Sequence, residues 1–271
     1  MNEIINTVNY NTLGAANSLY GQNTIKTDAN AAFPGIMPKT GINKDSFVHS
    51  KEYADKNSKN PVTSSIDNFL ARFLPSLYID KYLNGNVIEN AVKTNPEITE
   101  LLAAKGLEPK VYIENVKGKN KEHFLTTYNK AKELGRNLPL DEYSTLLQSS
   151  LLHDIGKAFI PPEILNKPGA LTENEREIIN LHAEIGAEIL ETAGLPQKTV
   201  EAVRLHHTDW QDSKKINNKT AQILSAADVY SALKEERPYK KPFSDEEAMK
   251  IMQNDSKLNP SVVKDVFSSK N

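Results

Sequence analysis

The sequence predicts an all-α protein, a multi-helix bundle behind a leader that we expect to be mostly disordered. Residues 1–60 are rich in Asn, Thr, Ser, Gly and Lys, and their apolar residues stand singly without a period. From residue 61 onward the apolar residues recur at helical spacing. Residues 111–116 alternate as a short strand would, but one strand makes no sheet.

Start and stop signals place the helices in order. Thr172 with Glu175 and Ser244 with Glu247 each predict a capping box that opens a helix. Glycine or proline marks most of the other ends. The residues around Asp228 are almost all small or apolar, which is typical of a helix in the centre of a bundle. We expect helices over residues 66–74, 98–102, 119–133, 141–153, 172–194, 196–207 and 220–233, with a further one from residue 244.

The chain divides into a flexible polar leader (1–60), a helical N-terminal extension (61–117) and a main helical domain (118–271). Together the two helical parts have a size suited to one domain. The extension has three interpretations: it packs on the bundle, mediates a homodimer, or holds a regulator.

Composition excludes several functions. Thirty-three Lys and Arg against 35 Asp and Glu leave no basic excess to attract duplex nucleic acid or anionic lipid. No stretch of about 18 apolar residues predicts a membrane span, and the start lacks a secretory signal, so we expect a cytoplasmic protein. The absence of cysteine rules out disulfides, thiolate zinc sites and cysteine nucleophiles.

Histidines and aspartates are the remaining candidates for metal chemistry. Five of the six histidines lie on separate predicted helices or as a doublet, and helical bundles build metal sites from such inward side chains. A lone helical histidine is more often a core or surface residue, and that is our interpretation of His49 in the leader. An unpaired Asp228 would be costly to bury among apolar residues, so it needs a cation or several donors. The candidate ligands are His123, His153, Asp154, His182, His206, His207 and Asp228.

One run of residues resembles a known family. Leu151-Leu152-His153-Asp154-Ile155-Gly156-Lys157, with the later His182, the doublet His206-His207, Ala227-Asp228 and Arg237-Pro238-Tyr239-Lys240, is similar to the HD-domain metal-dependent phosphohydrolases, specifically their HD-GYP branch. The similarity runs from about His123 to the C-terminus, so residues 118–271 are the expected HD domain.

The resemblance implies a site and a reaction. The seven candidate ligands would hold two divalent ions, most readily Fe or Mn, with Asp154 bridging them and a shared hydroxide attacking phosphorus. Lys157 would stabilise charge on the attacked phosphate, and Arg237 and Lys240 would bind the other substrate phosphates. The implied substrate is a cyclic dinucleotide of the cyclic di-GMP type.

Two departures from the family pattern bear on this. The Gly-Tyr-Pro signature is missing after the doublet, where the chain reads Thr208-Asp209-Trp210-Gln211-Asp212. Lys119 stands where some members have a glutamate that supports a third metal ion. We therefore expect two metal ions instead of three. Two alternatives stay open: an HD-domain hydrolase of nucleoside phosphates, and a catalytically silent signalling module.

Overall fold

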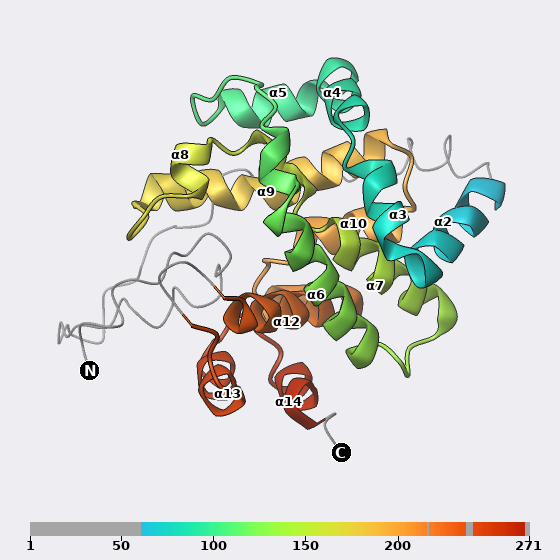
Figure 1. Cartoon of the computed structure of the whole chain (residues 1–271), viewed down its shortest axis with the longest axis vertical. Coiled ribbons are helices and arrows are strands. Elements are labelled where there is room, and N and C mark those ends of the chain that lie inside the picture. Colours follow the sequence, from blue (N-terminus) through green and yellow to red (C-terminus); the bar gives the residue numbers. More distant parts are fainter. Residues whose placement is uncertain (1–60, 216, 237–240, 269–271) are drawn as a thin grey trace.

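The computed structural model describes residues 61–215, 217–236 and 241–268, and this part of the chain consists of helices joined by turns and loops (Figure 1). No strand occurs among the described residues, which confirms the all-α class. The leader over residues 1–60, with His49, lies outside them. None of the described helices has the length and apolar character needed to cross a membrane. In chain order the elements are α2 (Pro61–Phe73), α3 (Pro75–Tyr82), α4 (Gly85–Thr94), α5 (Pro96–Ala103), η3 (Ile113–Val116), α6 (Lys119–Leu134), α7 (Leu140–Leu152), η4 (Ile155–Phe159), α8 (Pro162–Leu165), α9 (Glu173–Thr192), α10 (Gln197–Leu205), α11 (Trp210–Lys215), α12 (Lys219–Lys234), α13 (Asp245–Gln253) and α14 (Pro260–Ser268).

Local signals set the helix ends as predicted. Both capping boxes are present: the hydroxyls of Thr172 and Ser244 each accept a backbone N–H three residues on, and the glutamate there returns the bond. Gly194, which follows α9, has φ +77°, the left-handed conformation that glycine favours. The predicted central helix is α12, and its residues from Thr220 to Leu233 are all buried except Tyr230.

The alternating segment 111–116 is not a strand, so that interpretation was wrong. Part of it forms η3, a single 3₁₀ turn. The Asn115 amide donates to the carbonyl oxygens of Lys157 (2.9 Å) and Ile160 (2.7 Å), both at the turn η4. The backbone N–H of Tyr112 also donates to the carbonyl oxygen of Ala158 in η4 (2.6 Å). The segment therefore bonds to η4 instead of a neighbouring strand, and these contacts brace the turn that follows Asp154.

Five helices pack together in the middle of the molecule: α6, α7, α9, α10 and α12 (Figure 1). The helices α13 and α14 pack on α12 on one side, whereas α2 to α5 pack on α7 and α9 on the other. Residues 61–103 of the extension (61–117) thus pack on the bundle, one of the three roles left open for it. Three apolar clusters fill the interior of the described part: one mainly among α2 to α5, α7, α9 and α10, a second around α6 and α12 to α14, and a smaller one around α8 and the start of α9.

The apolar residues that predicted the first helix are largely exposed. Ile66, Phe69 and Phe73 on α2 are 51%, 54% and 60% exposed, and Leu77 on α3 is 55% exposed. Their helical spacing predicted the helix correctly but not its burial. A helix can show an apolar stripe that its own domain does not cover.

A close contact of two glycines joins η4 to α9. A Cβ on Gly156 would overlap the carbonyl oxygen of His182 and lie 2.6 Å from the backbone nitrogen of Gly186. Because these atoms belong to the backbone of α9, they cannot turn aside as a side chain could. The turn after Asp154 can approach His182 this closely only with glycine at position 156.

Replacing Gly156 by alanine should therefore be costly. We expect Gly156→Ala to lower the free energy of unfolding by more than about 2 kcal/mol, because η4 must move away from α9. Urea denaturation measures the change. Gly85→Ala is the matched control, since the nearest atom to a Cβ there is 3.9 Å away. Equal stability of the two variants would show that the contact does not constrain the turn.

Candidate metal centre

The structure brings all seven predicted ligands to one place in the bundle. Six are buried, and His207 is half-buried. Four of them lie at the ends of helices and not within them. His153 and His206 are the C-capping residues of α7 and α10, and Asp154 and His207 follow them. The ligands come from α6 (His123), the end of α7 (His153, Asp154), α9 (His182), the end of α10 (His206, His207) and α12 (Asp228).

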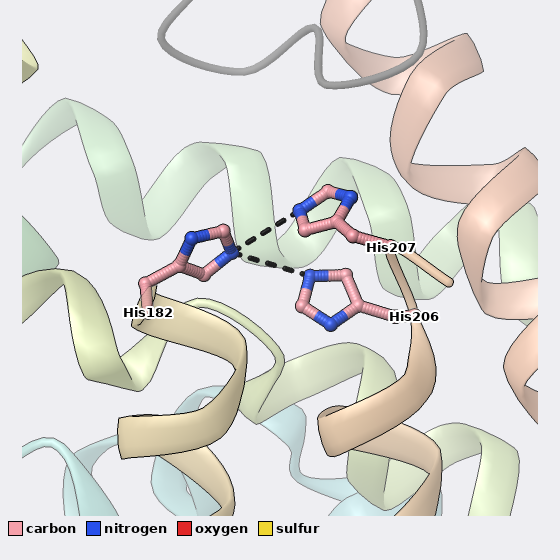
Figure 2. A group of neighbouring side chains, drawn as sticks. All are labelled: His182, His206 and His207. Atoms are coloured by element: carbon pink, nitrogen blue, oxygen red, sulfur yellow. Dashed lines mark hydrogen bonds between the residues drawn. The ribbon is translucent and has the colours of Figure 1, made fainter. Parts of the chain in front are cut away.

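Three histidines form one half of the centre (Figure 2). The Nε2 atom of His182 lies 3.3 Å from Nε2 of His206 and 3.1 Å from Nε2 of His207. Because a carbonyl oxygen only accepts, Nδ1 of His182 donates to Ile179 and Nδ1 of His206 donates to Val203, each at 2.6 Å. In the neutral rings the Nε2 atoms of His182 and His206 are then unprotonated, so their lone pairs face the same point.

A second half is formed by His123, His153 and Asp154, with Asp228 beside them. Nε2 of His123 lies 2.9 Å from Oδ1 of Asp228. Nε2 of His153 lies 3.3 Å from Oδ2 of Asp154 and 3.6 Å from Oδ1 of Asp228. Nδ1 of His153 donates to the carbonyl oxygen of Ser150 (3.0 Å), which leaves Nε2 directed at the two carboxylates.

Asp154 lies between the two halves. Its Oδ1 is 3.2 Å from Nε2 of His182, whereas its Oδ2 is on the side of His153 and accepts a hydrogen bond from Nζ of Lys157 (2.6 Å). Neither Oδ1 of Asp154 nor Nε2 of His153 has a hydrogen-bond partner, although both atoms are fully buried. Of the predicted substrate-binding residues, Lys157 thus reaches the centre, while Arg237 and Lys240 lie outside the described residues.

The charges differ between the two halves. Burial opposes ionisation of Asp154, but the adjacent His153 and Lys157 outweigh it and hold its pKa well below the usual value. Burial also disfavours a charged His153, yet Asp154 and Asp228 raise its pKa to about 10. Burial and the neighbouring His182 lower the pKa of His207 to about 3. His207 is therefore neutral at pH 7, whereas His153 holds a proton that a metal ion would displace.

Two features around the centre were not predicted from the sequence. Glu235, at the C-cap of α12, contacts Nδ1 of His123 through Oε1. Its spacing of two helical turns from Asp228 was the available signal. Arg204, two residues before His206, bonds Glu188 at 2.8 Å and also pairs with Glu184 of α9. No local sequence pattern predicts the pairing of Arg204 with α9. It holds α10 against α9 and so positions His206 next to His182.

Comparison with known proteins agrees with the site. The HD-domain family matches residues 107–262. The 3'3'-cGAMP-specific phosphodiesterase 2 of Vibrio cholerae is 37% identical over 115 residues, which cover 39% of this chain and 22% of that protein. Cyclic di-GMP phosphodiesterase PA4108 of Pseudomonas aeruginosa is 36% identical over 112 residues, 38% of this chain and 27% of that protein. A cyclic di-GMP phosphodiesterase of Thermotoga maritima is 36% identical over 130 residues, 44% of this chain and 34% of that protein.

The chain therefore spans between 22% and 34% of the length of these three relatives. The family match covers more than half of the chain and includes all seven predicted ligands. The chain belongs to the HD-domain family.

Proposed function

We propose that the chain is a metal-dependent phosphodiesterase that hydrolyses a cyclic dinucleotide, with two divalent ions, Fe or Mn, as cofactors. The observation that carries the proposal is the placement of Asp154, a buried carboxylate whose two oxygens face two separate sets of imidazole nitrogens. A carboxylate in that position can bridge two ions.

The residues fit such a pair of ions. The buried Oδ1 of Asp154 and Nε2 of His153 have no hydrogen-bond partner, which is costly unless a cation satisfies them. Imidazole nitrogen and carboxylate oxygen together suit Fe, Mn and Zn. His182, His206 and His207 would hold one ion and His123, His153 and Asp228 the other, with Asp154 shared between them.

The chain's own groups orient the reaction. When bound, two such ions supply an activated water and positive charge for the phosphoryl oxygens. Lys157 keeps a cationic Nζ beside Asp154 at 2.6 Å in a buried position. From there it can donate to an oxygen of the attacked phosphate, where charge develops. Arg237 and Lys240 follow α12 in the sequence and are proposed to bind the second phosphate.

The relatives favour a cyclic dinucleotide as the substrate. Those compared above carry names that specify hydrolysis of cyclic di-GMP or 3'3'-cGAMP. The Gly-Tyr-Pro signature is absent, and residues 210–215 form α11 at that place in the chain. A nucleoside phosphate therefore stays the alternative substrate. The convergence of all seven ligands supports an enzyme over a silent signalling module. Homodimerisation stays a prediction, supported by the exposed apolar side chains of α2 and α3.

Metal removal should destabilise the protein, because the ions bind only the folded chain. At a free Mn²⁺ concentration 100 times the dissociation constant, the linkage contributes about 2.7 kcal/mol per site. We expect Mn²⁺ to raise the Tm of the chelator-stripped chain, and His206→Ala to reduce that rise. Differential scanning calorimetry with and without Mn²⁺ measures this. His49→Ala is the control. If Mn²⁺ does not change the Tm of the wild type, the metal centre is contradicted.

Asp154→Asn keeps the shape of the side chain but removes its charge and one acceptor oxygen. We expect it to lose metal binding and to lower turnover at least roughly 1,000-fold. Elemental analysis gives ions per chain, and chromatography of cyclic di-GMP, 3'3'-cGAMP and a panel of nucleotides gives turnover. Asp141→Asn, which alters an exposed surface ion pair with Lys198, should behave as the wild type. A metal-loaded wild type that is inert towards the cyclic dinucleotides would refute the substrate assignment.

A further inference from the structure

His123 lies between two carboxylates of the same helix. Its ring comes from α6, its Nε2 is 2.9 Å from Oδ1 of Asp228, and its Nδ1 contacts Oε1 of Glu235. Asp228 lies on α12 and Glu235 is its C-capping residue, seven residues or about two helical turns later, so the two acids face the same side. The imidazole is thus held at both nitrogens by one neighbouring helix.

The other buried histidines of the centre are held differently. His153, His182 and His206 each donate Nδ1–H to the carbonyl oxygen three residues earlier in the chain. Those bonds are local, and a neutral carbonyl accepts each of them. His123 instead depends on a side chain 112 residues away in the sequence, and its partner is a carboxylate.

A carboxylate on Nδ1 has two effects on a metal-binding histidine. It fixes the proton on Nδ1, so that Nε2 presents its lone pair, and it makes that lone pair a better electron donor. In this chain Nε2 is the atom that faces Asp228 and Asp154, at 2.9 and 3.7 Å. Glu235 therefore lies where it can fix the proton on Nδ1 of His123 and strengthen Nε2 as an electron donor.

We propose that Glu235 is a positioning residue, which orients His123 and strengthens its hold on one of the two ions. The inference rests on the proposed two-metal function and adds a residue to it. Glu235 acts through His123 and does not touch the ion itself. Its side chain is 26% exposed, against 6% for His123, so it lies on the solvent side of the buried ring.

The test is a titration of the metal-free full chain with Mn²⁺ alone. Glu235→Ala should weaken binding of one ion about 10- to 100-fold and leave the other ion unchanged. Glu235→Gln keeps a carbonyl oxygen that accepts from Nδ1, so it should lose less than the alanine variant. Glu236→Gln removes the same charge from an exposed side chain one residue later and should bind both ions as the wild type does.

A double variant separates positioning from a structural role. His123→Ala should weaken the same ion, and adding Glu235→Ala to it should cause no further loss, because the residue acts through that ring. Additive losses, or normal binding of both ions by Glu235→Ala, would overturn the proposal. If the alanine variant fails to fold by circular dichroism, Glu235→Gln in the same cycle decides. A wild type that binds no Mn²⁺ would overturn the proposed function as well.

Discussion

The structure depends on one buried carboxylate that needs positive charge on both of its sides. Asp154 is only 3% exposed, and an isolated carboxylate in the interior would cost several kcal/mol. Lys157 and His153 satisfy it on one side, and Nε2 of His182 lies 3.2 Å from its Oδ1 on the other, where His206 and His207 adjoin His182. All five central helices contribute to the site around this group: α6, α9 and α12 from within the helix, and α7 and α10 from their C-terminal ends.

The packing around Asp154 serves the same requirement. Gly156 lets the following turn lie against the backbone of α9, which brings His182 close to the carboxylate. Asn115 braces that turn from outside, and Arg204 ties α10 to α9. Three clusters of buried apolar residues pack these helices together. Stability thus comes from apolar burial, while the polar residues fix the geometry.

The sequence was sufficient for the parts that local chemistry dictates. Capping boxes, glycine stops and apolar periodicity placed many of the helices, although α3, α4 and α14 were not expected, and the run around His153 and Asp154 pointed to the candidate ligands. It failed where long-range contacts decide. Residues 111–116 alternate as a strand does, yet their partner is η4, and Glu235 meets His123 only through the packing of α12 on α6. The stripe of α2 showed a helix but could not show that its neighbours leave it exposed.

The most direct test is a crystal structure of the protein grown with Mn²⁺, with anomalous scattering recorded at the manganese edge. We expect two peaks, one within His182, His206 and His207 and one beside His123 and His153, with an oxygen of Asp154 directed at each. A single ion elsewhere, or no ion near Asp154, would contradict it.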